Sequence, residues 1–255
     1  MHPSRQPVRI RVLSDLHLNH RDWVAPGNVP ADLVMLAGDI TNGVEGIRWA
    51  RRVFPDQPIV YVAGNQECYG NNIDELVPQL RVVAHEQDVH FLEQEVLRFR
   101  DLRILGATLW TDFNLFGRSE HWLAKETAIA DRPADRKTIR TDSGILTPAV
   151  MIERHKATLR WLEAELERDF DGKTIALTHH VPTMQGLPPL WRDDFSSAAF
   201  ASHLDWLFPQ VDAWVCGHTH TFADFHAGRC RVVINPRGRT VGSKNGFNPE
   251  LVIEV

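Results

Sequence analysis

The sequence is poor in cysteine and lacks any long hydrophobic run, and both shortages exclude classes of protein. It has three cysteines in 255 residues, with no CxxC spacing among them. This odd, scattered set argues against a disulfide framework and against a zinc knuckle. No run approaches the roughly 18 apolar residues of a membrane span, and residues 1–7 lack the apolar core of a signal peptide. We therefore expect a cytoplasmic protein that makes no use of a membrane.

An excess of basic charge is also missing. The chain has 28 lysines and arginines against 33 aspartates and glutamates, for a formal net charge of −5. Proteins that bind the nucleic-acid backbone need a basic surface, so stable nucleic-acid binding is not expected. Affinity for a phosphate group would have to be local, for example through bound metal ions.

The remaining composition is that of an ordinary globular protein. Hydrophobic residues make up 43% of the chain and charged residues 24%. The length suffices for one full hydrophobic core. Because no repeat, low-complexity tract or linker interrupts the sequence, we expect a single domain over residues 1–255.

Short apolar runs alternate with helix-like stretches in the first third of the chain. Residues 8–13, 32–37 and 59–63 predict buried strands of the parallel type. Residues 44–54 and 73–87 predict the helices that follow the second and third strands. This order indicates an α/β protein, in which ligands bind beyond the carboxyl ends of the strands.

The rest of the chain predicts a mixture of strands, helices and one long excursion. The elements are a meander of 90–92, 96–99 and 102–107, helices at 148–170 and 196–208, a loop at 183–194, strands at 173–177, 211–216 and 251–255, and a hairpin of 221–225 with 231–234. Residues 114–147 lack periodicity, so we expect an excursion near the site, since loops of this length are usually functional or mobile. Trp110, Trp122 and Trp191 fall near this predicted site, and whether they stack on the base of a substrate stays open.

Candidate metal ligands follow most of the predicted strands. They are Asp15, His17, Asp39, Asn65, His179, His218 and His220. Members two residues apart, such as His218 and His220, would share one side of an extended segment. Carboxylate, amide and imidazole donors without sulfur suit manganese, iron, zinc or nickel. Seven donors suit two ions that share a carboxylate, an arrangement that activates water and clamps a phosphoryl group.

The motifs that contain these residues resemble the calcineurin-like metallophosphoesterase superfamily. They are DxH at 15–17, GDxxxxG at 38–43, GNxE at 64–67, a histidine after a late strand and GHTH at 217–220, in the family's order over nearly the whole chain. The LWTDF (109–113) and NPRG (235–238) segments are similar to those of a small bacterial branch. The resemblance implies a four-layer α/β/β/α sandwich of two mixed β-sheets flanked by helices.

The resemblance also implies a ligand set and a chemistry. Asp15, His17, Asp39 and His220 would bind a first divalent metal, and Asp39, Asn65, His179 and His218 a second, with Asp39 bridging. Manganese is the expected metal, with iron, zinc or nickel as alternatives. A hydroxide held by the two ions would attack the phosphorus of a small phosphoester substrate, such as a nucleotide, in line with the leaving oxygen. His180 and Arg237 would help at the phosphate, although a surface or structural role for each is equally open.

The sequence departs from the family at Gln66, where most members have a histidine that assists the leaving group or the phosphoryl charge. Glutamine forms hydrogen bonds but carries no proton to transfer at neutral pH. Three interpretations are open: a natural variant that favours phosphodiesters, an engineered substitution that slows turnover, or a metal-binding scaffold without catalysis. The complete ligand set argues against the third, so we expect phosphodiesterase or aryl phosphomonoesterase activity.

Overall fold

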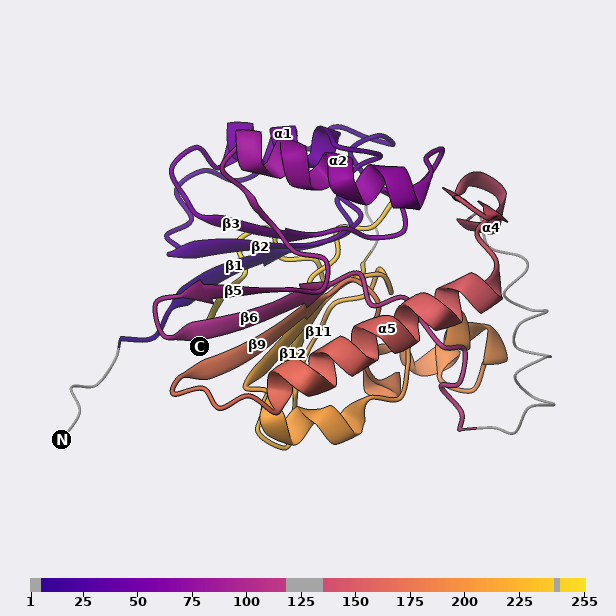
Figure 1. The fold of residues 1–255 in the computed structure, drawn as a ribbon. Coiled ribbons are helices and arrows are strands. Elements are labelled where there is room, and N and C mark those ends of the chain that lie inside the picture. The colour runs from indigo at the N-terminus through magenta and orange to yellow at the C-terminus, as the bar shows by residue number, and fades with distance from the viewer. Residues whose placement is uncertain (1–5, 118–134, 241–243) are drawn as a thin grey trace.

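Two β-sheets lie face to face in the computed structural model of the protein, and helices cover their outer faces (Figure 1). The structure describes residues 6–117, 135–240 and 244–255. Helices α1 and α2 cover one sheet and α5 covers the other, which gives the expected four-layer α/β/β/α sandwich. The predicted fold class is confirmed.

The first sheet has the order β13-β1-β2-β3-β4, with β13 antiparallel to its neighbour and the other strands parallel. Its strands are β1 (Arg9–Leu13), β2 (Leu33–Ala37), β3 (Ile59–Val62), β4 (His90–Phe91) and β13 (Val252–Glu254). Three of them are the buried parallel strands that the apolar runs predict.

The second sheet has the order β11-β12-β10-β9-β6-β5. Its strands are β5 (Glu95–Phe99), β6 (Leu102–Ala107), β9 (Lys173–Thr178), β10 (Ala213–Cys216), β11 (Ala223–Ala227) and β12 (Cys230–Ile234). The four inner strands are parallel, and β5 and β11 pair antiparallel at the two edges. The predicted hairpin near the C-terminus is the pair β11–β12.

The core between the sheets follows from the two-residue period of the strands. Ile10 and Val12 of β1 and Met35 of β2 belong to one buried cluster with Ile104 and Ile175 of the opposite sheet. The alternate side chains, such as Leu13 and Leu36, face the outer cluster that the helices cover. Successive side chains of a strand point to opposite faces, so strands buried on both sides read as continuous apolar runs.

The α-helices of the described residues are α1 (Glu45–Val53), α2 (Ile73–Glu86), the short α4 (Asp135–Thr138) and α5 (Pro148–Leu166). Two of them, α2 and α5, begin where the sequence supplies a capping side chain. The Asn72 side chain accepts the Asp74 N–H at the start of α2, and the Thr147 side chain accepts the Val150 N–H at the start of α5. The small pair β7 (Arg140–Thr141) and β8 (Gly144–Ile145) lies between α4 and α5 in the sequence.

Two predicted elements are wrong. The meander does not form, because β4 extends the first sheet beside β3 while β5 and β6 form a hairpin in the second. The predicted helix at 196–208 is two 3-10 helices, Phe195–Ala199 and Asp205–Gln210. Between them the N–H groups of Ser202 and Leu204 donate to the carbonyls of Val181 and Pro182 at 2.9 and 2.8 Å. Those bonds to a distant segment replace the bonds that a continuous helix would make.

The segment at 183–194, predicted as a loop, contains two single-turn 3-10 helices, Met184–Gly186 and Pro189–Trp191. Across the described residues, no helix has both the length and the apolar character needed to cross a membrane.

Candidate metal centre

The carboxyl ends of parallel strands from both sheets bring the predicted ligands to one edge of the sandwich. Asp15 and His17 follow β1, and Asp39 and Asn65 follow β2 and β3. From the other sheet, His179 follows β9, and the Gly217–His220 segment follows β10. Residues separated by as many as 205 positions in the chain (15 to 220) therefore come into contact.

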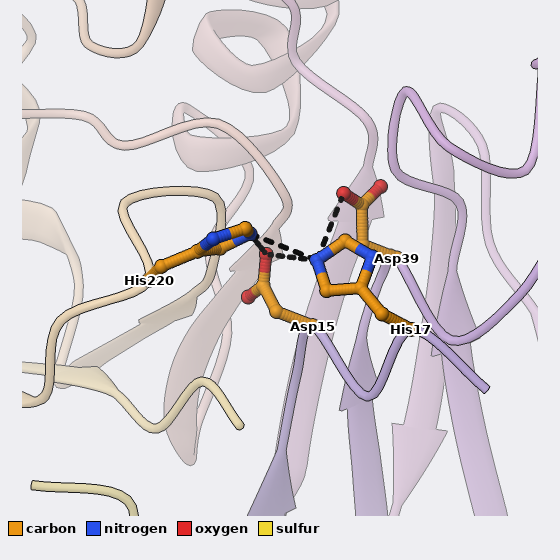
Figure 2. A group of neighbouring side chains, drawn as sticks. All are labelled: Asp15, His17, Asp39 and His220. Carbon is orange, nitrogen blue, oxygen red and sulfur yellow. Dashed lines mark hydrogen bonds and ion pairs between the residues drawn. The ribbon is translucent and has the colours of Figure 1, made fainter. Parts of the chain in front are cut away.

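The first group of donors is Asp15, His17, Asp39 and His220, drawn in Figure 2. The Nε2 atoms of His17 and His220 lie 2.8 Å apart. His220 Nε2 lies 3.3 Å from Asp15 Oδ1, and His17 Nε2 lies 3.8 Å from Asp39 Oδ2. Two imidazole lone pairs at this separation require a shared proton or a cation between them.

The second group is Asp39, His179 and His218. His179 Nε2 lies 3.3 Å from Asp39 Oδ1 and 3.1 Å from His218 Nδ1. The amide oxygen of Asn65 joins this group, because it lies 3.0 Å from the same ring nitrogen. Within each of the two His and Asp groups the donor atoms lie within 4.8 Å of one another, and Asp39 is common to both. One carboxylate can thus serve two neighbouring ions.

The backbone at these positions is not extended. Asp15, His17 and Asp39 have φ values of 50, 48 and 55°, and His218 and His220 have 71 and 52°. The left-handed region is uncommon for residues other than glycine, and such strain gathers at functional sites. The predicted alternation along an extended segment is therefore wrong, and His218 and His220 point into different donor groups.

Glycines in the motifs allow the strand ends to approach one another. A Cβ atom added at Gly64 would lie 2.1 Å from Asp39 Oδ1, and one at Gly217 would lie 2.6 Å from Asp15 Oδ2. Cβ atoms in proteins essentially never approach another heavy atom this closely. The glycine before Asn65 and the glycine before His218 are thus required for the donors to converge.

Burial and neighbouring charges shift the pKa values of the donors in different directions. Burial acts to lower the pKa of His179, but the carboxylates of Asp39 and Asp15 outweigh it and raise that pKa. For Asp39, His17 and His218 burial prevails. It raises the pKa of Asp39 to about 7 despite the opposing charge of His179. Burial also lowers the pKa of His17 to about 3 and that of His218 far below its usual value. Neutral imidazole is the form that binds metal, and a divalent ion can replace the proton on a buried carboxyl group. The donor set and its electrostatics therefore fit a pair of divalent cations.

Glu67 connects the loops that carry Asp39 and Asn65. Its buried carboxylate accepts the N–H groups of Asp39, Ile40 and Gly64 at 2.8–2.9 Å. It also accepts the hydroxyl of Tyr61 at 2.6 Å. The sequence places Glu67 in the GNxE motif, but its structural role follows from these contacts alone.

Gln66 lies behind the donors instead of in the cavity before them. Its side chain is buried, and its Oε1 accepts a hydrogen bond from Nδ1 of His17. Its Nε2 donates to the side-chain oxygens of Asn19 and, at 3.3 Å, of Asn42. An acceptor at Nδ1 places the proton there and leaves the Nε2 lone pair of His17 directed at the first donor group.

A cavity of about 200 Å³ opens in front of the donors. Four candidate ligands line it, namely Asp39, Asn65, His218 and His220. The remaining lining residues are the polar Tyr69, Asp135 and Arg239 and the apolar Trp191, Ala199 and Phe200. The cavity is the space in which a small substrate would meet both donor groups.

Asp135 is a site residue that sequence reasoning missed. Its Oδ1 accepts the Nδ2 amide of Asn65 at 2.9 Å and the hydroxyl of Tyr69 at 2.5 Å. These bonds orient the Asn65 amide so that its oxygen points to His179. Asp135 belongs to the predicted excursion at 114–147, of which residues 118–134, with Trp122, lie outside the described residues. Its aperiodic surroundings carried no signal for this contact.

Arg237 and His180 are predicted to assist at the phosphate group. Neither is among the described residues that line the cavity. The Arg237 guanidinium donates to the backbone carbonyls of Leu16, Arg21 and Asp22. His180 is buried, with Nδ1 3.3 Å from the Thr108 carbonyl and its ring centroid 4.2 Å from that of His218. Arg239, two residues beyond Arg237, is the arginine that reaches the cavity.

A carboxylate shared between two groups of donors is an arrangement that can hold two neighbouring metal ions. The calcineurin-like phosphoesterase superfamily domain matches residues 8–253, and the chain belongs to this superfamily. Membership in it, with the donor groups, supports a metal-dependent phosphoester hydrolase that acts on small phosphoesters. No curated protein matches the chain.

Solved structures show the same fold. The phosphopantetheinyl hydrolase PptH from Mycobacterium tuberculosis is 21% identical, with 98% of this chain and 96% of that chain covered and a TM-score of 0.67. A candidate 5′-nucleotidase from Staphylococcus aureus, in complex with alpha-ketoglutarate, is 12% identical with a TM-score of 0.50. That match covers 91% of this chain and 49% of the other. At these identities the likeness concerns the fold.

Proposed function

We propose that the protein is a dinuclear metal-dependent phosphoester hydrolase that cleaves phosphodiesters, aryl phosphomonoesters or both. The observation that carries the proposal is the position of Asp39, whose carboxylate belongs to both donor groups. Two metal ions that together bind a phosphoryl group lie about 3.5–4 Å apart, and a carboxylate that bridges them suits this separation. Manganese is the proposed metal, with iron, zinc or nickel as alternatives for this mixed donor set.

Asp15, His17, Asp39 and His220 would hold one ion, and Asp39, Asn65, His179 and His218 the other. Two such ions supply an activated water nucleophile and offset the charge of the phosphoryl oxygens. Arg239 would bind a phosphoryl oxygen from the cavity side, since a guanidinium matches phosphate geometry. Gln66 would keep His17 in the tautomer that binds metal.

A second candidate is a metal-binding scaffold with impaired catalysis. The observation that favours it is Gln66, which has no proton to transfer at neutral pH and does not line the cavity. General acid catalysis is worth about 10²–10⁴-fold in rate. Good leaving groups need little of that help, so aryl phosphates and aryl phosphodiesters are the substrates on which the two candidates differ most clearly.

The test is metal analysis of the purified protein, followed by hydrolysis of bis(p-nitrophenyl) phosphate and p-nitrophenyl phosphate with and without Mn²⁺. We expect two ions per chain and turnover that depends on them. Asp39→Asn should abolish turnover and lower the number of bound ions. Two bound ions without turnover on either substrate, and turnover restored by Gln66→His, would instead establish the impaired scaffold. Absence of metal binding would overturn both candidates.

A further inference from the structure

Three aromatic rings lead from the donor groups to the mouth of the cavity. The ring of His218 lies 4.8 Å from that of Phe200, with 34° between the planes. The ring of Phe200 in turn lies 5.5 Å from that of Trp191, with 51° between the planes. All three residues line the cavity. The series passes from a nearly buried histidine to a tryptophan that is 38% exposed.

The backbone of Trp191 is held in place, and its partly exposed ring packs against that of Phe200. Trp191 ends a 3-10 turn that begins at Pro189, and its N–H donates to the Pro188 carbonyl at 2.9 Å. Its own carbonyl accepts the Ser197 hydroxyl at 2.7 Å and the Asp194 N–H at 3.1 Å. An aromatic side chain on an anchored backbone has only two rotatable torsions, so it loses little entropy when a ligand binds to it.

The cavity also has a place for the phosphoryl group. Arg239 lines it, with Nη2 3.4 Å from Gln66 Oε1 and the guanidinium 6.0 Å from the centroid of the Tyr69 ring. The volume of about 200 Å³ is close to the roughly 150 Å³ that holds one benzene molecule. A phosphoryl group at the donors therefore leaves room for about one flat ring against Phe200 and Trp191.

We propose that Phe200 and Trp191 form a stacking subsite for a planar aromatic group of the phosphoester. This inference rests on the proposed function, since the phosphoryl group is taken to lie at the donor groups. The substrate class is then aromatic phosphoesters in preference to alkyl phosphoesters. Stacking favours flat rings over saturated rings of similar size, because a π-face offers close contact over its whole area.

Binding of three phosphonates to the Mn²⁺-loaded protein tests the subsite without any turnover. Phenylphosphonate, cyclohexylphosphonate and methylphosphonate share the phosphoryl group and differ in the group beside it. We expect the phenyl compound to bind more tightly than the other two. Trp191→Ala should weaken phenylphosphonate binding about 5- to 100-fold and change methylphosphonate binding less than twofold. Trp191→Leu, which keeps an apolar side chain without a flat face, should behave like Trp191→Ala.

Trp206→Ala is the matched control, because Trp206 is 48% exposed and does not line the cavity. It should leave all three affinities unchanged. A kinetic comparison uses two diesters with the same leaving group, p-nitrophenyl phenyl phosphate and methyl p-nitrophenyl phosphate. The ratio of kcat/KM for the phenyl diester to kcat/KM for the methyl diester should fall in Trp191→Ala.

The outcomes separate the two proposals. Equal binding of phenyl- and cyclohexylphosphonate, with no effect of Trp191→Ala, would overturn the stacking subsite, while methylphosphonate binding would still uphold the metal centre. If none of the three compounds binds to the Mn²⁺-loaded protein, binding of a phosphoryl group at the donor groups is refuted, and with it both the proposed hydrolase and the subsite.

Discussion

Oε1 of Gln66 accepts a hydrogen bond from Nδ1 of His17, so the amide supports a candidate ligand from behind. The family resemblance predicts that residue 66 acts at the leaving group or on the phosphoryl charge. In the structure the side chain is buried and is held by Asn19 and Asn42. Histidine ligands commonly depend on such a partner for their tautomer and orientation.

Replacement of this acceptor should weaken metal binding. Gln66→Leu removes the partner of His17 Nδ1 and should lower the affinity for metal about 10- to 100-fold. Gln66→Glu retains a carbonyl-type acceptor and should keep most of the affinity. Competition with a chelator of known affinity measures the difference, and Gln79→Leu at an exposed position of α2 is the control. Wild-type affinity in Gln66→Leu would contradict the assignment.

Removal of the Asp135 carboxylate should release the Asn65 amide. In Asp135→Ala the Asn65 Nδ2 loses its carboxylate acceptor and keeps only the Tyr69 hydroxyl at 3.0 Å. That hydroxyl also loses its bond to Asp135, so the amide oxygen is held less firmly towards His179. We expect the second equivalent of metal to bind about 10- to 100-fold more weakly while the first is unaffected. Stepwise calorimetric titration resolves the two equivalents. Asp142→Ala, which removes an exposed acceptor of Asn72, should leave both unchanged, and the same result in Asp135→Ala would refute the prediction.

Loss of the charge on Glu67 should destabilise the fold as well as the site. Glu67→Gln turns one of two acceptor oxygens into a donor that faces N–H and O–H groups. Leaving such buried donors unpaired should lower the free energy of unfolding by about 3 kcal/mol. Urea denaturation measures this loss. Glu95→Gln, at a half-exposed ion pair with Arg81, should cost about 1 kcal/mol or less, and a similar cost for both variants would argue against the role of Glu67.

Asp212 should contribute to the acid limb of the stability curve, far from the metal centre. Burial acts to raise its pKa, but the Thr174 N–H and the Arg229 guanidinium outweigh burial and lower the pKa below 3.8. A lowered pKa in the folded state stabilises the protein above the unfolded value of about 3.9, and that contribution disappears as the pH falls through the folded value.

Asp212→Asn should therefore lower the free energy of unfolding by about 1–2 kcal/mol at pH 7, and the difference from wild type should shrink as the pH falls and the Asp212 carboxylate of the folded protein is protonated. Unfolding measured at pH 7 and at a series of acidic pH values checks the sign. A difference from wild type that grows on acidification would contradict the prediction, and Asp193→Asn at an exposed position serves as the control.

Much of the architecture was readable from local pattern. The strands β1, β2 and β3 are continuous apolar runs, and α5 begins at a threonine followed by proline, because neighbours in the chain suffice to specify both. The same holds for the candidate ligands, since parallel strands must end at a common edge and the motifs follow those ends. The helix expected at 196–208 does not form, because backbone hydrogen bonds to Val181 and Pro182 outweigh the local helix propensity.

By itself, then, the sequence determined the α/β class and the family motifs, and it singled out the candidate donor residues. The tertiary structure alone decided that Gln66 faces His17, that Asp135 orients Asn65, and that Arg239 instead of Arg237 reaches the cavity. The physical reason is separation along the chain. Periodicity reports which face of an element is buried, whereas contacts such as that between Asn65 and Asp135, 70 residues apart, exist only once distant segments have packed together.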